Sequence, residues 1–537
     1  MFTESEVSGY IPIVDLFAGP GGLGEGFSSV EGDPFRIIVS AEMDSSARST
    51  LRLRAFYRQL KRQGGSALDS YYRYCNGQAE VCFDSSNKDA WIESGEEARQ
   101  LELGRADHND ELDKRINMHG LGPDSPWVLI GGPPCQAYSL VGRARNRGKV
   151  EYKAEEDHRH FLYKEYLRII QKYRPAVFVM ENVKGILTAR VGGKKIFETI
   201  LRDLTDPDGA TGMPASGRGY RIHSLTCETK FSSGDDPAKI DVHDFVIRAE
   251  AHGIPQARHR VILIGVRDDI ARSPGVIPFA VPTSVGQTIG SMPRLRSKLS
   301  KQLDSSENWA NVVREHFDQM AKEAKGVKKL ADLHEVLKHA ARQVPSGLGI
   351  GNVQLRKHGD TGTSDILGNW YHDPQLSVWL NHEARGHMSS DLRRYAYASA
   401  FAKAFGKSPI GHDDFSLQGL RPNHENWESG KFADRFRVQL HNRPATTVTS
   451  HISKDGHYFI HPDPLQCRSL TVREAARLQT FPDNYFFLGN RTEQFHQVGN
   501  AVPPLLAQKI GEIVFSLLQA SNSATFRRTN RGRDCIT

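Results

Sequence analysis

A cysteine lies in a segment rich in glycine and proline, GGPPCQAYS, at residues 131–139 of the chain. The segment follows an apolar run, WVLIGG at 127–132, which predicts a buried strand. Ligands of open parallel sheets bind at the carboxyl ends of the strands, and two prolines make the loop before Cys135 rigid. The position therefore suits a nucleophile. A lone cysteine is more often a small buried apolar residue, so this interpretation needs support from other motifs.

A second candidate site follows the first predicted strand. The apolar run ends in a glycine-rich turn, FAGPGGLG at 17–24, which removes side chains where a ligand must approach the backbone. Glu42 ends the next predicted strand, where an acid can accept both ribose hydroxyls of a nucleoside. The alternative is a tight turn and a surface acid. The Gly-Lys-Ser/Thr ending of a phosphate-binding loop is missing, so phosphate binding is not favoured.

Other short apolar runs, bounded by turn residues, must form the elements that position these sites. They lie at 35–44, 176–183 and 260–267, and a helix-like segment at 161–173 precedes the second of them. Alternation of this kind predicts an α/β fold with a mostly parallel sheet covered by helices.

The length of 537 residues exceeds one ordinary core and predicts two structural units. The alternation of strands and helices is lost in the middle of the chain and returns near residue 466. We predict a catalytic domain at 1–270 with a charged insertion at about 60–125 that has little core of its own, a second domain at 275–465, a return to the catalytic domain at 466–520, and a disordered basic tail at 521–537.

Composition narrows the classes of protein. The hydrophobic fraction is 38%, and neither an apolar run of membrane-spanning length nor a secretory signal is evident, so we expect a cytoplasmic protein with no membrane partner and no disulfides. The six cysteines include no C-x-x-C pair, so no metal site is predicted. The net charge of +7 permits a polyanionic partner without requiring one.

The order of the motifs supports the nucleophile. The glycine-rich turn, PPCQAYS at 133–139, ENV at 181–183, QARHR at 256–260 and QVGNAVPP at 497–504 together resemble the DNA cytosine-5 methyltransferase family. The resemblance implies a Rossmann-like S-adenosylmethionine-dependent methyltransferase fold with an inserted target-recognition domain. It also implies that the C-terminal segment packs beside the N-terminal strand, and that the protein is a modification enzyme of a prokaryotic restriction-modification system.

The resemblance assigns roles to individual residues. The cofactor, S-adenosylmethionine, is expected to contact Phe17, Gly19, Gly22, Glu42, Asn500 and Val502. The catalytic residues are expected to be Cys135 as nucleophile, Glu181 at the cytosine N3 edge, Arg260 at O2, and Arg258 in support of Glu181. Gln136 and Ser139 are expected to assist binding of the substrate base.

Two departures from the family pattern concern these assignments. Tyr138 stands where the family usually has Phe, a change that keeps the aromatic ring. The acid that contacts the adenine amino group has no clear position, because the charged insertion blurs the register; Asp113 is the candidate, with Asp107 and Asp110 as alternatives.

The chemistry requires these residue types. Cytosine C5 is too weak a nucleophile to accept a methyl group unaided, and thiolate addition at C6 makes C5 enamine-like. A protonated Glu181 at N3 and a cationic Arg260 at O2 would stabilise the charge that develops on the ring. C5 and C6 lie inside the base stack, so the target nucleotide must rotate out of the duplex.

Two rival functions stay open at this point. One is an RNA cytosine-5 methyltransferase, against which the long middle domain argues, and the other is a non-catalytic DNA-binding relative, which intact Cys135, Glu181 and Arg260 disfavour. We expect a monomer that acts on double-stranded DNA in the nucleoid, with a cognate restriction endonuclease as a candidate partner. The middle domain, which mixes cations, aromatic residues and amides, is expected to choose among cytosines.

Overall fold

A nine-stranded sheet forms the centre of the protein in the computed structural model, which describes residues 9–134, 162–191, 193–358, 367–422 and 434–531. Its order is β3-β2-β1-β4-β5-β12-β8-β9, with β10 paired to β12. The first five of these strands are parallel, and β12 runs antiparallel to both β5 and β8. The strands are β1 (Ile11–Leu16), β2 (Phe35–Glu42), β3 (Ala98–Gln100), β4 (Val128–Gly131), β5 (Val177–Val183), β8 (Tyr220–His223), β9 (Lys230–Phe231), β10 (Val246–Arg248) and β12 (His259–Arg267).

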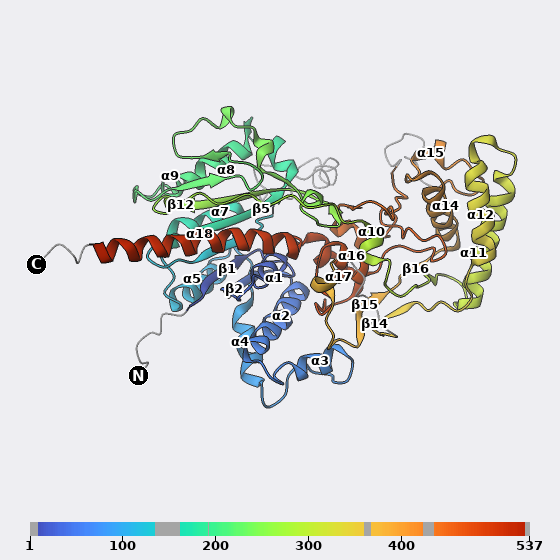
Figure 1. The fold of residues 1–537 in the computed structure, drawn as a ribbon, viewed down its shortest axis with the longest axis horizontal. Coiled ribbons are helices and arrows are strands. Elements are labelled where there is room, and N and C mark those ends of the chain that lie inside the picture. Colours follow the sequence, from blue (N-terminus) through green and yellow to red (C-terminus); the bar gives the residue numbers. More distant parts are fainter. Residues whose placement is uncertain (1–8, 135–161, 192, 359–366, 423–433, 532–537) are drawn as a thin grey trace, which may run out of the picture.

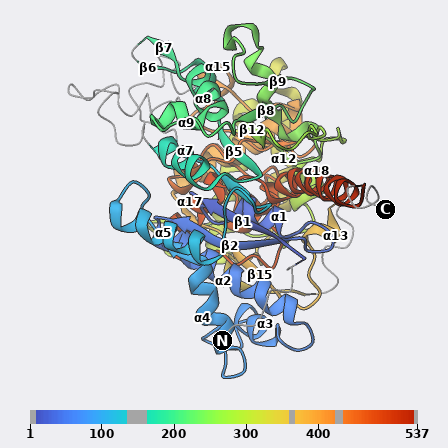
Figure 2. The same ribbon diagram turned by 90° about the vertical axis from the view of Figure 1, so that its left-hand side faces the viewer.

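Helices cover both faces of the sheet, as Figure 2 shows with α18 on one side of β1 and β2 and with α5 and α7 on the other. Near-continuous buried runs such as Val177–Met180 are typical of strands with two covered faces. α7 (Leu162–Tyr173) buries Tyr166, Ile169, Ile170 and Tyr173, which share one helical face. The predicted α/β fold and the elements at 35–44, 161–173, 176–183 and 260–267 are confirmed.

The C-terminal part of the chain returns to the N-terminal strand. α18 (Pro504–Arg531) lies along α1 (Gly22–Phe27) across the front of the sheet (Figure 1). Ile13 of β1 shares a buried apolar cluster with Leu506, Ile510 and Val514 of α18. The expected return of the C-terminal segment is therefore confirmed. α18 also continues to Arg531, so the helix occupies most of the predicted tail; residues 521–531 contain no glycine or proline.

The charged segment at 60–125 contributes to the core, which corrects the prediction of an insertion with little core. β3 is the edge strand of the main sheet, and α5 (Ala106–Met118) buries Leu112 and Ile116 against it. α3 (Asp69–Cys75) and α4 (Lys88–Glu97) pack with α2 (Ser45–Gln63) around a further cluster that includes Tyr71 and Phe56. Charged residues cover these helices and conceal the sparse apolar positions in the sequence.

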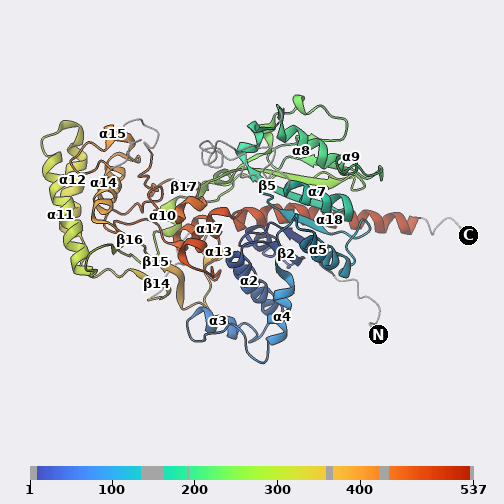
Figure 3. The ribbon, with the colours of Figure 1, turned by 180° about the vertical axis from the view of Figure 1, so that it is seen from behind.

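The middle of the chain contains two differently packed parts. α11 (Ser306–Ala324), α12 (Ala331–Gln343) and α14 (Ser389–Phe405) form a helical bundle around Trp309 and Phe317, at the far end of the molecule from the C-terminus (Figures 1 and 3). β14 (Gly351–Arg356) and β15 (Val378–Glu383) form a separate two-stranded antiparallel sheet, and residues of β15 pack against α2 and α3. The limits 275–465 of the second domain stay a prediction. β15 falls within these limits, although it packs against α2 and α3, which belong to the predicted catalytic domain.

One apolar stretch of the described residues, Arg491–Gln519, is long enough by composition to cross a membrane. It comprises α17 (Arg491–Asn500) and the first part of α18, and 61% of its most apolar window is buried inside the protein. Its apolar residues therefore contribute to the core.

A buried ion pair joins the first two helices. Arg54 of α2 donates two hydrogen bonds to the Glu25 carboxylate of α1, at 2.8 and 2.5 Å, and both side chains are 5% exposed. Burial raises the pKa of Glu25, but the charge and hydrogen bonds of Arg54, together with the charge of Arg58, outweigh burial and leave the pKa below its usual value. The pair therefore stabilises the fold above the ordinary glutamate pKa, and this stabilisation is lost as the pH falls through the lowered value.

We predict that Glu25→Ala lowers the free energy of unfolding by about 3–5 kcal/mol at neutral pH, because Arg54 is left as an unpaired buried charge. Denaturant titration measures this loss, which should shrink in acid. Arg73→Ala, which breaks an exposed pair with Asp84, is the control and should change stability by less than about 1 kcal/mol. Equal losses in the two variants would contradict the prediction.

Candidate functional site

The turn after β1 has a backbone that few side chains tolerate. Phe17, Gly19 and Gly21 have φ of 56°, 57° and 93°. Positive φ is costly for a non-glycine residue, so Phe17 is held in place by its surroundings. A Cβ added to Gly19 would have no atom within 4 Å, so this part of the turn faces open space. The turn can therefore admit a ligand against its backbone, as predicted from the sequence.

Glu42 is tied to this turn. Its carboxylate accepts hydrogen bonds from the backbone N–H of Gly19 and of Asp44, both at 2.8 Å. Burial raises the pKa of Glu42, although these hydrogen bonds act in the opposite direction. The acid at the end of β2 and the glycine-rich turn are thus parts of one site.

The returning C-terminal segment closes the turn from the other side. A Cβ on Gly22 would lie 2.1 Å from the carbonyl oxygen of Val502, a distance that no real side chain could have. Val502 is 7% exposed, and exposed Asn500 ends α17 two residues earlier. The structure therefore brings Gly22 and Val502 together.

Asp113, the main acid candidate on α5, is held by another helix. Asp113 forms ion pairs with Arg168, at 2.9 Å, and with Lys172, both of which belong to α7. These contacts place its carboxylate between two covering helices, so the assignment of Asp113 to the adenine is corrected. Asp107 forms an exposed pair with Arg105 at 2.8 Å, and Asp110, also on α5, is exposed.

The sequence analysis did not predict β3, the strand that points to another candidate for the acid at the adenine amino group. Gln100 of β3 is paired in register with Glu42, so the chain just after β3 lies beside the end of β2. Glu102 is the first acid after this strand, and its side chain is 54% exposed. A three-residue strand is too short for alternation to be recognised, and only LEL at 101–103, just after it, alternates.

The segment that leads to Cys135 begins beside Glu181. Cys135, Gln136 and Ser139 lie outside the described residues, but the three residues before Cys135 are described. A Cβ on Gly132 would lie 3.2 Å from Glu181 Oε2, and Asn182 Nδ2 donates to the carbonyl of Pro133 at 3.3 Å. The end of β4 and the end of β5 are thereby held together.

Glu181 and Arg260 form an ion pair. Arg260 Nε lies 2.9 Å from Glu181 Oε1, and the two side chains are 15% and 14% exposed. Antiparallel pairing of β5 with β12 brings them together, with Arg260 opposite Val183 and Ile262 opposite Glu181. Burial lowers the pKa of Arg260, an effect that the Glu181 charge opposes. A carboxyl group and a guanidinium thus meet beside the start of the loop.

Arg258 is hydrogen-bonded to two distant backbone segments, and its support of Glu181 stays a prediction. Its guanidinium donates to the carbonyl oxygens of Val448, at 2.9 Å, and Gly499, at 3.4 Å. Burial, followed by the nearby charge of Arg260, lowers its pKa well below the usual value. Its hydrogen bonds therefore hold three distant segments together, and its effect on Glu181 is electrostatic.

The model of one family, C-5 cytosine-specific DNA methylase, matches residues 97–208 and 240–516, more than half of the chain. The chain belongs to this family.

Relatives of known activity support the same assignment over almost the whole length. Type II methyltransferase M.Bpa9945I of Bacillus paralicheniformis is 32% identical over 521 residues, which cover 94% of this chain and 98% of the relative. DNA (cytosine-5-)-methyltransferase M.ApeKI of Aeropyrum pernix is 26% identical, with coverage of 94% and 98%. The protein is a DNA (cytosine-5-)-methyltransferase of the type found in restriction-modification systems, with the Rossmann-like fold of methyltransferases.

The methyltransferase also contains a buried amide chain that the sequence reading missed. Gln256 is fully buried; its Nε2 donates to Gln479 Oε1 at 3.0 Å, and its Oε1 accepts from the Val448 N–H at 2.7 Å. Gln479 Nε2 in turn donates to the carbonyl of Val498 at 2.7 Å. Gln256 is the first residue of the QARHR motif, so the sequence analysis had singled out its segment. Only the fold shows that its hydrogen-bond partners come from the C-terminal part of the chain.

The described cysteines of the methyltransferase differ from one another. Burial raises the pKa of Cys75 to about 12 and that of Cys82 to about 11, and it also raises the pKa of Cys467. For half-buried Cys227, burial is outweighed by hydrogen bonds with Thr229 and Ser224, which lower the pKa. Cys227 lies between β8 and β9 at the sheet edge, so among these four it is the one to test as a rival nucleophile. The described residues contain no group of three or more His, Cys, Asp or Glu that could hold a metal ion.

We predict that Glu42→Ala weakens S-adenosylmethionine binding about 10–100-fold, because charge-assisted hydrogen bonds are lost. Isothermal titration calorimetry measures the affinity. Asp107→Ala is the control and should bind like the wild type. Unchanged affinity in Glu42→Ala would show that the cofactor does not lie at the end of β2.

Proposed function

We propose that the enzyme methylates C5 of a cytosine in a specific duplex DNA sequence through a covalent bond between Cys135 and C6, with S-adenosylmethionine as methyl donor. The observation that carries this proposal is the Glu181–Arg260 pair, which lies beside Gly132 at the beginning of the Cys135 loop. A carboxyl group and a cation next to the proposed nucleophile are the groups that addition to a cytosine ring requires, because the carboxyl group can share a proton with N3 and the cation can stabilise charge at O2.

The cofactor fits the residues around the glycine-rich turn. Gly19 faces open space, the Glu42 carboxylate is fixed beside it, and Val502 closes the turn through its contact with Gly22. Phe17 would contact the adenine, and Glu42 would accept hydrogen bonds from the ribose, with Asn500 at the same edge. When bound here, S-adenosylmethionine supplies an electrophilic methyl group. Glu102, after β3, replaces Asp113 as the candidate for the adenine amino group.

The reaction begins with the Cys135 thiolate, whose sulfur forms a bond to C6 of the cytosine. The ring electrons move toward N3, where Glu181 donates a proton, while Arg260 stabilises the charge at O2. This addition leaves C5 electron-rich, so that it would accept the methyl group that bound S-adenosylmethionine supplies. Loss of the C5 proton, for which we propose water as the base, expels the Cys135 thiolate, and return of the N3 proton to Glu181 restores the neutral ring.

The substrate base must leave the helix before this chemistry. Unstacking costs a few kcal/mol, which contacts with the DNA must offset. We propose that Gln136 and Ser139 contribute to these contacts, and that the middle of the chain, including the helical bundle, selects the target sequence. The enzyme would act in the cytoplasm as a monomer on the nucleoid, and a restriction endonuclease of the same specificity is the expected companion.

The rival of an RNA substrate is weakened by the relatives, whose names describe type II methyltransferases and a DNA (cytosine-5-)-methyltransferase. Methyl transfer to duplex DNA and to RNA, measured in parallel with the same donor, tests the assignment. Transfer to DNA alone is expected, and transfer to RNA alone would overturn it.

Cys135→Ser should reduce turnover to less than about one thousandth of the wild-type value while cofactor affinity stays near that of the wild type, because an alcohol is a far poorer nucleophile than a thiolate.

Duplex DNA with 5-fluorocytosine at the target should become covalently attached to the wild-type enzyme, since fluorine cannot leave as a proton does. Peptide mapping locates the adduct. Cys227→Ser is the matched control and should keep full activity; an adduct on Cys227 would refute the assignment.

Glu181→Gln should lower kcat about 10²–10³-fold and change DNA affinity little, because the interaction strengthens as charge develops on the ring. Steady-state kinetics and equilibrium DNA binding measure the two quantities. Glu198→Gln, which alters an exposed pair with Lys195, serves as the control. If kcat and DNA affinity fell by similar factors, Glu181 would contribute to binding of the ground-state base and not to stabilisation of the transition state, which would contradict the prediction.

A further inference from the structure

A buried ion pair lies where the chain enters and leaves the helical bundle. Arg468 and Glu474 are 0% and 1% exposed and form two hydrogen bonds, both of 2.7 Å. We propose that this is a positioning pair, which sets the orientation of the helical bundle relative to the catalytic site and so contributes to the choice of target. This inference rests on the proposed role of the middle of the chain in recognition.

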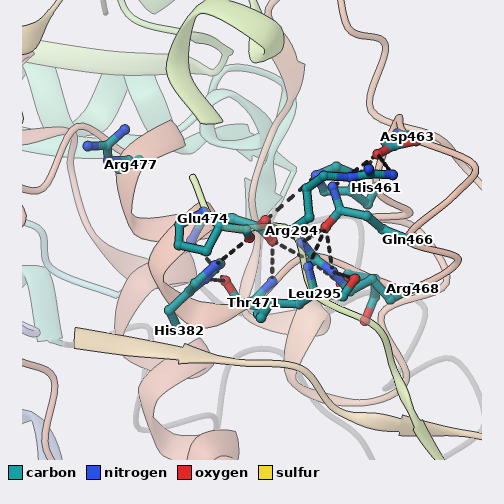
Figure 4. Close-up of polar contacts among 12 residues, drawn as sticks. Arg294, Leu295, His382, His461, Asp463, Gln466, Arg468, Thr471, Glu474 and Arg477 are labelled. Atoms are coloured by element: carbon teal, nitrogen blue, oxygen red, sulfur yellow. Dashed lines mark hydrogen bonds and ion pairs between the residues drawn. The ribbon is translucent and has the colours of Figure 1, made fainter. Parts of the chain in front are cut away.

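The pair joins the two crossing segments, which we define as the entry segment, residues 293–296, and the exit segment, residues 461–469. Arg468 of the exit segment donates to the carbonyl of Leu295 in the entry segment at 3.2 Å and to Gln466 Oε1 at 2.6 Å. Gln466 Oε1 also accepts from the Leu295 N–H at 3.0 Å. Figure 4 shows these contacts converging on the Arg468 guanidinium. The two segments are therefore fixed to each other.

The other partner of the pair belongs to the catalytic side. Glu474 lies in the first turn of α16 (Val472–Leu478), where its carboxylate accepts the N–H of Thr471 at 2.7 Å and completes a capping box. Thr471 Oγ1 is in turn 2.9 Å from His382 Nδ1 of β15, and His382 Nε2 lies 3.1 Å from the carbonyl of Pro293 in the entry segment. One carboxylate thus links the crossing segments to α16, close to β15.

The helical bundle is attached to the same network. His461 Nε2 lies 3.6 Å from Glu474 Oε1. The backbone carbonyl of His461 accepts a hydrogen bond of 3.0 Å from the Ser399 hydroxyl of α14. Burial lowers the pKa of both His461 and His382 to about 4, so both rings are neutral at physiological pH. The two histidines therefore add no positive charge beside the Arg468–Glu474 pair.

The network continues to the catalytic site through the end of α16. Gln479, which caps this helix, contacts Gln256 and the carbonyl of Val498. Gln256 begins the QARHR motif that supplies Arg260. A rotation of the exit segment about α16 would consequently move the helical bundle relative to the Glu181–Arg260 pair.

Stability alone does not account for a pair at this depth. A buried ion pair contributes little more than a well-packed apolar pair of the same volume, because both charges lose their hydration. The guanidinium fork, however, demands one geometry from its partners. Directional contacts at a crossing point between two parts of a protein are suited to fixing an angle, which apolar contacts would leave free.

The test removes both charges together, in R468M/E474Q, because a single change would leave one buried charge unpaired. Glutamine keeps the capping box of α16. Methylation of a library of duplexes that differ from the target by one base pair, read by bisulfite sequencing, measures discrimination. Formation of the 5-fluorocytosine adduct, calorimetry of cofactor binding and thermal unfolding are measured on the same protein.

The matched control is R174M/D208N, which removes another buried arginine–carboxylate pair, between α7 and α9 (Pro207–Thr211), away from the crossing segments. We expect R468M/E474Q to fold, to bind cofactor like the wild type and to form the adduct, but to lose discrimination by at least about fivefold. The control should keep wild-type discrimination even where its melting temperature falls.

Wild-type discrimination in a folded R468M/E474Q protein would overturn the proposal, as would an equal loss in R174M/D208N. If the double variant unfolds, R468K separates the effect of geometry from that of charge, because lysine keeps the positive charge but lacks the guanidinium fork. Undiminished discrimination in R468K would also overturn the proposal. Failure of the proposed covalent chemistry would appear differently, as absence of the adduct in the wild-type enzyme.

Discussion

The backbone at Gly22 and the backbone at Val502 approach so closely that no side chain fits between them. A Cβ at residue 22 would lie 2.1 Å from the Val502 carbonyl oxygen, and the same close packing continues where Gly26 meets Ala507 of α18. The glycine-rich turn therefore has two requirements, space for a ligand at Gly19 and contact with the C-terminal segment at Gly22. The site at the end of β1 and β2 depends on both.

Much of this arrangement could be predicted from the sequence because its signals are local. Buried strands are continuous apolar runs, and PPCQAYS, ENV, QARHR and QVGNAVPP are motifs whose order identifies the family. The ends of β4 and β5 lie together, as expected, and Glu181 and Arg260 meet across paired strands. The residues of the Cys135 loop lie outside the described structure, so their roles stay predictions.

The errors have physical causes that a single sequence does not reveal. The segment 60–125 was interpreted as an insertion because its apolar residues are few and widely spaced, yet Leu112 and Ile116 complete the face of a large sheet. Asp113 was chosen by position along the chain, whereas its carboxylate is held by Arg168 and Lys172 of another helix. The hydrogen-bond partners of Arg258 were not foreseen for the same reason, because they lie 190 and 241 residues away, at Val448 and Gly499; its support of Glu181 stays a prediction.

The return of α18 to α1 also determines when the enzyme can become active during its synthesis. A ribosome releases the chain from the N-terminus, so β1, β2, β4 and β5 emerge long before Val502 and the helix that follows it. Until then the turn lacks the surface that closes it, and the apolar face of the sheet around Ile13 lacks Leu506 and Ile510. A nascent or prematurely terminated chain therefore carries the proposed nucleophile but lacks the segment that closes the glycine-rich turn, and we expect DNA modification to begin only after Val502 and α18 have been added.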